Sequence, residues 1–185
     1  MVLSVNDARA QALDAAEELI YARGVHAVGM DDVRDRSGVS LKRLYALFPR
    51  KEALVEAVLE RRDQRWRRHL GEFVERVEDP DERLLAVFDW LAAWFAEPGF
   101  RGCAWINVFG ELGATSPALL AQVRGHKDRF ADQLARWVSE AGRPPALASQ
   151  LLLLAEGAMV TAGIHGDPGA AHTARNAAGA LLGRP

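Results

Sequence analysis

GVSLKRLYALFPRKEAL, residues 38–54, places a tight turn, a short helix and the start of a longer helix in one window. Gly38 can end a preceding helix, because glycine takes the left-handed backbone conformation at little cost. Ser40 can then cap a helix that we expect to run to about Leu47. Before the turn, we expect another short helix from Asp31 to Ser37. Two short helices joined by such a turn have the geometry of a helix-turn-helix.

Positive charge is concentrated around this turn. Between Arg34 and Lys51 there are six cations and one anion, whereas the whole chain has a formal net charge of −2. A charge run is often only a solvated helix face, and that reading suits RRDQRWRR, residues 61–68, on the longer helix. It does not suit cations placed on a very short helix beside a tight turn. This local excess is typical of a surface that meets DNA phosphates.

The residue types of the second short helix suit contact with DNA. Such a helix lies in the major groove, where Lys42 and Arg43 could donate to guanine O6 and N7. Leu41 could touch a thymine methyl group, and the Tyr45 hydroxyl could bond a phosphate. Lys51 falls in the first turn of the next helix, whose free amides and dipole already favour an anion. We therefore predict a phosphate clamp at Lys51.

Residues 9 to 54 resemble the DNA-binding head of the tetracycline-repressor-type (TetR) family of one-component bacterial regulators. The resemblance is carried by RAQALDAAEELIYARG (9–24), Val33, GVS (38–40), Leu44-Tyr45, Phe48-Pro49 and KEAL (51–54). It implies that residues 40–46 enter the groove and that Tyr45 and Lys51 contact phosphates. The predicted DNA-binding residues are Ser40, Leu41, Lys42, Arg43, Tyr45, Ala46, Arg50 and Lys51.

Four features depart from the family pattern. Arg34 stands where the family usually has a small residue after the buried branched position, Val33. Gly29-Met30 stands where a threonine or serine usually opens the first of the two helices, which removes a hydroxyl contact. Leu41-Lys42-Arg43 replaces a common Lys-Gly-Thr, and Arg50 replaces the usual serine before the clamp lysine. These changes leave the docking intact, but the base preference does not follow by analogy.

The rest of the chain is also expected to be helical. Hairpin turns and sustained apolar–polar alternation are missing from the sequence, whereas helical spacing recurs throughout its 185 residues. Asp79-Pro80, Ser116-Pro117 and Asp167-Pro168 each place a capping side chain before a proline at a helix start. A long helix from about Arg50 to Val77 is expected to carry Leu54, Val58, Trp66, Leu70 and Phe73 inward. The fold class predicted is all-α, with about nine helices.

The resemblance divides the chain into two domains. Residues 1–52 would be the helix-turn-helix DNA-binding head, and residues 53–185 a ligand-binding and dimerisation body. Aromatic residues are concentrated in the body, where core packing explains most of them. An apolar cavity with a few polar groups is the functional alternative, and the resemblance implies an unidentified small-molecule effector there. The predicted ligand-binding residues are Trp66, Trp94, Cys103, Asn107, Glu111 and His126.

The last two predicted helices, LASQLLLLAEGAMVTAGIHG (147–166) and PGAAHTARNAAGALLG (168–183), are rich in leucine and small residues. Exposed on a monomer, they would form a broad apolar patch, which soluble proteins avoid. Two such helices from each of two subunits could bury it in a homodimer, with the heads roughly 34–36 Å apart on a palindromic site. Alternatively, they only close the core of one subunit. The predicted interface residues are Leu152, Ala155, Met159, Ala174, Ala178 and Leu181.

The expected function is that of a ligand-responsive regulator, more often a repressor in this family, that binds a double-stranded DNA operator. One alternative keeps the head and makes Cys103 a redox sensor. A remote alternative is a small helical hydrolase using Cys103 and His126, although nothing in their spacing requires proximity. We predict no catalytic residue, metal site or cofactor. The N-terminus lacks a signal-peptide pattern and no apolar run approaches ~20 residues, so we expect a cytoplasmic protein without a membrane partner.

Overall fold

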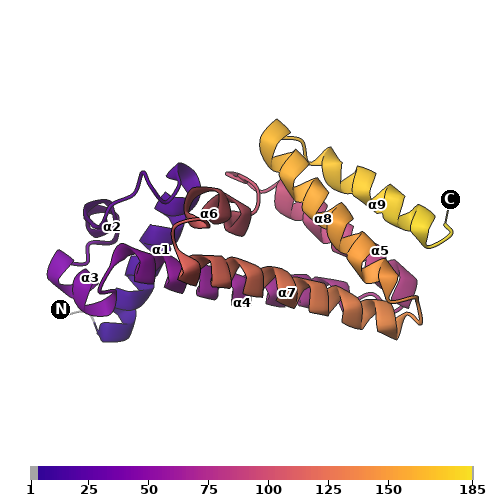
Figure 1. The fold of residues 1–185 in the computed structure, drawn as a ribbon, viewed down its shortest axis with the longest axis horizontal. Coiled ribbons are helices and arrows are strands. Elements are labelled where there is room, and N and C mark those ends of the chain that lie inside the picture. The colour runs from indigo at the N-terminus through magenta and orange to yellow at the C-terminus, as the bar shows by residue number, and fades with distance from the viewer. Residues whose placement is uncertain (1–3, 185) are drawn as a thin grey trace. The chain divides into compact units, whose positions relative to one another are not determined.

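A computed structural model describes residues 4–184, and within them the chain forms nine α-helices and no strand (Figure 1). This confirms the all-α prediction. The helices are α1 (Val5–Arg23), α2 (Met30–Ser37), α3 (Leu41–Leu47), α4 (Lys51–Val74), α5 (Pro80–Phe95), α6 (Ala104–Leu112), α7 (Pro117–Glu140), α8 (Ala146–His165) and α9 (Gly169–Leu181).

The helices belong to two compact units. The first unit contains the described chain up to Asp63 together with Ala104–Val123. The second contains Gln64–Cys103 and the described chain from Arg124 onward. The long helix α4 contributes to both units, and α6 belongs to the first. The predicted domain boundary between residues 52 and 53 stays a prediction, because these units follow spatial contact and not a single cut in the chain.

Local signals account for the helix ends around the turn. Gly38 ends α2 with φ 71°, in the left-handed conformation, and its N–H donates to the Arg34 carbonyl. Ser40 is the N-cap residue of α3, although its side chain makes no capping hydrogen bond. The Asp79 side chain accepts from the Glu82 N–H at 2.8 Å directly before Pro80. The predicted capping at this position is confirmed.

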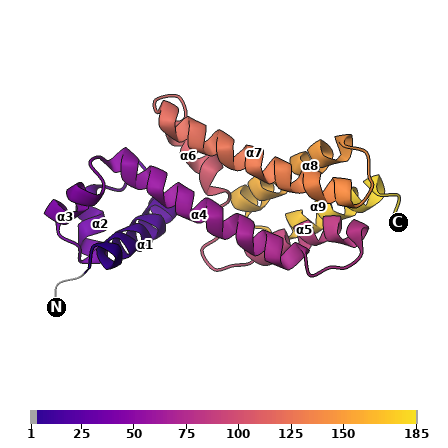
Figure 2. The same cartoon turned by 90° about the horizontal axis from the view of Figure 1, so that it is seen from below.

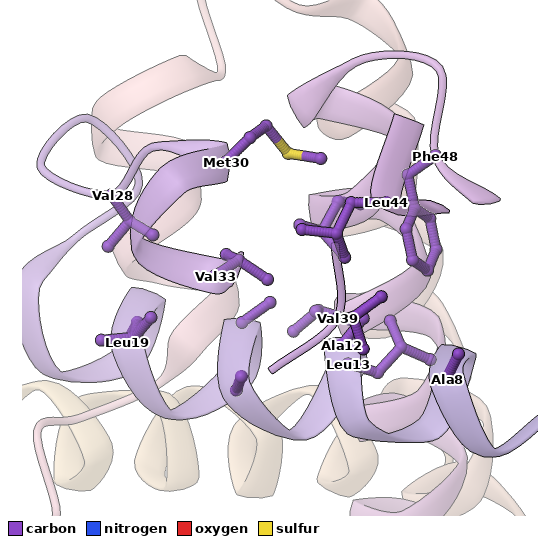
Figure 3. Close-up of a cluster of buried hydrophobic side chains, with 14 residues drawn as sticks. Ala8, Ala12, Leu13, Leu19, Val28, Met30, Val33, Val39, Leu44 and Phe48 are labelled. Atoms are coloured by element: carbon purple, nitrogen blue, oxygen red, sulfur yellow. The ribbon is translucent and has the colours of Figure 1, made fainter. Parts of the chain in front are cut away.

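A buried apolar cluster holds α1, α2 and α3 together in the first unit (Figure 3). Leu44 and Phe48 pack from α3 and its C-cap against Val33 of α2 and Leu13 of α1. All four side chains are at most 3% exposed. Burying this side of α3 turns its opposite side outward, and the position of the groove-entering helix therefore depends on apolar packing.

In the second unit, α8 and α9 pack against each other and both pack against α5 (Figure 2). Arginines reinforce one end of this bundle: Arg143 and Arg184 both pair with Asp81. The hydrogen bond from Arg143 lowers the pKa of Asp81, with burial acting in the opposite direction.

One expectation for α4 was wrong, because Phe73 is 38% exposed, whereas Trp66 and Leu70 are buried as predicted.

Candidate nucleic-acid interface

The outward side of α3 carries the side chains that the sequence singled out. Lys42, Tyr45 and Ala46 are all exposed, Tyr45 by 50%. Positions i, i+3 and i+4 lie on one face of a helix, so these three residues share a surface. Leu41 and Arg43 are partly exposed beside them. Helix α3 thus has one apolar face, which packs in the core, and one polar face, which is available to a partner.

Carboxylates neutralise part of the cationic window. Arg34 pairs with Asp31 and Asp35, and its hydrogen bond lowers the pKa of Asp35. Arg36 pairs with Glu18 of α1 at 2.6 Å. In the same way, Arg50 pairs with Glu56 at 3.1 Å. The carboxylates therefore offset part of the positive charge that the sequence places in this window, at Arg34, Arg36 and Arg50.

Two lysines remain without such partners. Within residues 4–184, neither Lys42 nor Lys51 takes part in an ion pair or a side-chain hydrogen bond. Lys42 is in the first turn of α3 and Lys51 opens α4, three residues after Phe48, which is buried in the head. Both ammonium groups can therefore meet a phosphate without first losing a carboxylate. Arg50, predicted as a DNA contact, would have to exchange Glu56 for it.

Arg9 of α1 is a cation that sequence reasoning missed. Its guanidinium lies 5.3 Å from the ring centroid of Phe48, at the C-terminal end of α3. Arg9 is exposed, so it adds positive charge beside the end of the short helix. No sequence signal pointed to it, because the contact joins residues 39 positions apart in the chain.

Three of the predicted ligand-binding residues come together in the second unit. The ring centroid of Trp66 lies 5.8 Å from that of Trp94 and 5.3 Å from that of His126. Trp90 and Phe130 complete the surroundings, each at 5.1 Å from Trp66. The Trp66 indole Nε1 is buried, and in the described part of the chain it has no hydrogen-bond acceptor. This cluster is mainly aromatic, and the Trp66 N–H is an unused donor within it.

Cys103 lies in the same unit but in a polar setting. Its thiol is 3% exposed and its sulfur accepts a hydrogen bond from Lys127 Nζ at 3.4 Å. Lys127 also pairs with Glu156 at 2.7 Å. The structure thus joins Cys103 to a lysine–glutamate pair, while the His126 ring packs on Trp66.

Asn107 and Glu111, the other two predicted ligand residues, belong to the first unit. Both line a small cleft between α1, α4 and α6. The Glu111 carboxylate accepts hydrogen bonds from the backbone N–H groups of Val25 and His26. The predicted ligand set therefore divides between two places. In the described chain, no group of three or more His, Cys, Asp or Glu side chains could hold a metal ion.

The predicted dimer residues mostly face the core of their own subunit. Ala155, Met159, Ala174 and Ala178 are at most 7% exposed, Leu152 is partly buried, and Leu181 is 47% exposed. The first four side chains are thus unavailable to a partner, because α8 and α9 use them to pack against each other and α5. Other apolar residues of α8 are exposed instead: Leu153 by 73%, Val160 by 40% and Ile164 by 73%.

Helix α8 is also unusual in its overall composition. Its length and a mean hydropathy of 1.5 would suffice to cross a membrane, yet only 33% of that window is buried. One such helix is weak evidence for a membrane span, since helices in the cores of soluble proteins have similar composition. What distinguishes α8 is that much of its apolar surface faces outward.

Comparisons with known proteins agree with this geometry. Residues 12–58 match the family model described as bacterial regulatory proteins, tetR family. Residues 80–178 match that of the tetracyclin repressor-like C-terminal domain. The crystal structure of a TetR-family transcriptional regulator from Streptomyces coelicolor superposes with a TM-score of 0.86 at 27% identity, over 98% of this chain and 96% of that one.

Several curated proteins are similar in sequence, among them two bacterial regulators. The HTH-type transcriptional activator FasR of Mycolicibacterium smegmatis is 33% identical over 123 residues, or 64% of this chain and 53% of the relative. The chain thus spans about half the length of that protein. An uncharacterized HTH-type transcriptional regulator of Mycobacterium tuberculosis H37Rv is 30% identical over 165 residues, or 83% of this chain and 82% of the relative. With its helix-turn-helix head and matches to both family models, the chain belongs to the TetR family of bacterial transcriptional regulators.

Proposed function

We propose that this regulator binds a palindromic operator as a homodimer, acts as a repressor in the cytoplasm, and is released by a small, largely apolar effector. The observation that carries the proposal is the pair of cations without ionic partners, Lys42 and Lys51, on an exposed helix and at the start of the next one. Repressors are more common than activators in the family. A relative is named as an activator, so the direction of regulation is a separate measurement.

The exposed apolar side of α8 supports the homodimer. Leu153, Val160 and Ile164 are spaced by seven and four residues, which places them on one face of the helix. On a monomer they would form an exposed apolar strip, which soluble proteins bury against a partner. A second copy of the same face is self-complementary under two-fold symmetry. The interface that we propose thus contains these residues and Leu181, in place of the buried set predicted from the sequence.

The aromatic cluster around Trp66 supports an apolar effector. A ligand that enters among Trp66, Trp94 and His126 would replace ring contacts with its own apolar surface. It would also satisfy the Trp66 indole N–H, which has no acceptor in the described chain, if it carried a carbonyl or hydroxyl oxygen. We therefore propose an effector with an apolar body and one hydrogen-bond acceptor.

The family matches indicate a regulator, and we propose no catalytic activity.

Selection of bound sites from random DNA tests the function, and two variants test the assignment of contacts. Lys51→Ala should weaken binding to all sequences alike and reduce the slope of log affinity against log salt by about 1, since one phosphate contact is lost.

Arg43→Ala should instead relax the preference at one base position in each half-site. Binding is measured by fluorescence anisotropy at several salt concentrations. Equal affinities for the wild type and both variants at low salt would contradict the proposed interface.

A redox role for Cys103 is a second candidate, favoured by the ammonium of Lys127 at 3.4 Å from the sulfur. Cations beside a cysteine are typical of reactive thiols, which peroxide oxidises to sulfenic acid. We expect peroxide to release the wild type from its operator if the thiol is the sensor, and to leave Cys103→Ala bound. Release of both proteins at the same peroxide concentration would eliminate this function.

A further inference from the structure

Glu111, near the C-terminal end of α6, holds the turn between α1 and α2. Its carboxylate accepts the Val25 N–H at 3.0 Å and the His26 N–H at 2.9 Å, one on each oxygen. The His26 ring nitrogen Nε2 also lies 3.3 Å from the Glu111 carbonyl oxygen. Hydrogen bonds to a charged acceptor are stronger than neutral ones. We call this arrangement the Glu111 clamp.

The turn is shaped to receive this carboxylate. Gly24 has φ 87°, a conformation that favours glycine, and a Cβ at this position would lie 2.9 Å from Glu111 Oε1. In the described chain, the Val25 and His26 N–H groups donate to no backbone carbonyl. They donate instead to a carboxylate 86 and 85 positions away in the sequence. Without Glu111 both amides would have to be satisfied by water.

The apolar side of α6 packs into this unit. Ala104, Trp105 and Val108 of α6 are buried, and Val108 lines a small cleft together with Ile20 of α1 and Val58 of α4. Apolar contacts of this kind are not directional. Because hydrogen bonds are directional, the clamp sets where the end of α6 meets the turn.

We propose that Glu111 is a positioning residue of the DNA-binding head, acting through the turn that leads into α2. This inference rests on the proposed operator binding. The turn ends at Gly29, the N-cap residue of α2, and α2 leads through Gly38 into α3. If the turn is released, α2 and α3 sample more orientations relative to α1. The fraction of heads that are competent for DNA then falls, and the apparent affinity falls with it.

The first measurement asks whether the clamp exists in solution. Hydrogen exchange followed by NMR should show protected Val25 and His26 amides in the wild type. Both should exchange faster in Glu111→Ala, while the Gly24 amide, which donates to the Ile20 carbonyl, should stay protected. Glu111→Gln should give partial protection, because one oxygen acceptor remains. Unchanged exchange of the two amides in Glu111→Ala would overturn the clamp.

The second measurement asks whether the clamp positions the head. Against a site selected with the wild type, Glu111→Ala should bind about tenfold more weakly, as expected for losing hydrogen bonds to a charged group. The salt dependence should stay unchanged, because no phosphate contact is removed. Glu97→Ala, which removes an exposed carboxylate from the second unit, is the matched control and should bind like the wild type.

The outcomes separate the inference from the proposed function. Faster exchange with wild-type affinity would show that the clamp holds the turn without positioning the head, and would overturn the inference. A reduced salt slope in Glu111→Ala would also overturn it, because the effect would then come from lost phosphate contacts. If the wild type itself selects no sites from random DNA, the proposed operator binding fails, whatever the exchange experiment shows.

Discussion

Leu44→Ala is expected to destabilise the first unit by about 2–5 kcal/mol, the usual range for truncating a buried leucine to alanine. Leu44 is fully buried and packs from α3 into the cluster formed by α1 and α2 (Figure 3). The cavity falls at the contact that orients α3, so operator affinity should also drop sharply. Urea denaturation followed by circular dichroism measures the stability, and fluorescence anisotropy measures the binding.

The neighbouring residue supplies the control for this prediction. Tyr45 is 50% exposed on the opposite side of α3, and Tyr45→Phe removes only its hydroxyl group. This variant should unfold at the same urea concentration as the wild type and lose only one phosphate contact. A Leu44→Ala protein that is as stable as the wild type would mean that α3 is not anchored in the way described.

The double variant Leu153→Glu/Ile164→Glu is expected to be a monomer of about half the wild-type mass. Both side chains are 73% exposed on α8, so charges there should cost the subunit little and should repel the matching face of a second copy. A monomer binds each half-site independently, and we expect operator affinity to fall by about 10²–10⁴, the usual gain from linking two sites. Sedimentation equilibrium gives the mass, and titration with operator DNA gives the affinity.

Phe109→Glu is the matched control for the dimer prediction. Phe109 is 54% exposed on α6, and the substitution adds one glutamate, of the two in the double variant, at another exposed apolar position. It should sediment like the wild type and bind the operator with similar affinity. A double variant that remains dimeric would place the interface elsewhere, and a wild type that sediments as a monomer would remove the homodimer from the proposed function.

Much of the fold could be predicted from residues that are close together in the sequence. The turn at Gly38, the bounds of α3 and the cap at Asp79 were read correctly from the chain, because each depends on residues within one helical turn of one another. The same holds for the inward side of α3, since helical periodicity places Leu44 and Phe48 together. The beginning of α4 was placed within one residue, and its end was placed three residues too far along, at Val77 instead of Val74.

Contacts between distant segments were not predictable in this way. Arg36 was counted among the cations of the basic window, and it is folding that brings Glu18 of α1 to it. The sequences of α8 and α9 are rich in leucine and small residues, but this composition did not separate the side that packs inward from the side that faces out. Glu111 was predicted to contact a ligand, and the structure shows that its carboxylate accepts from the backbone amides of Val25 and His26, in the turn between α1 and α2.

The amino-acid order was thus enough for the helices, the helix-turn-helix and the place of its positive charge, because these follow from neighbours along the chain. The pairing of Arg36, the face of α8 that stays exposed and the contact that holds the turn before α2 depend on residues that are far apart in sequence. Those interactions depend on packing and on the removal of water from side chains. Both contribute to the free energy only in the folded chain, where the distant segments are in contact.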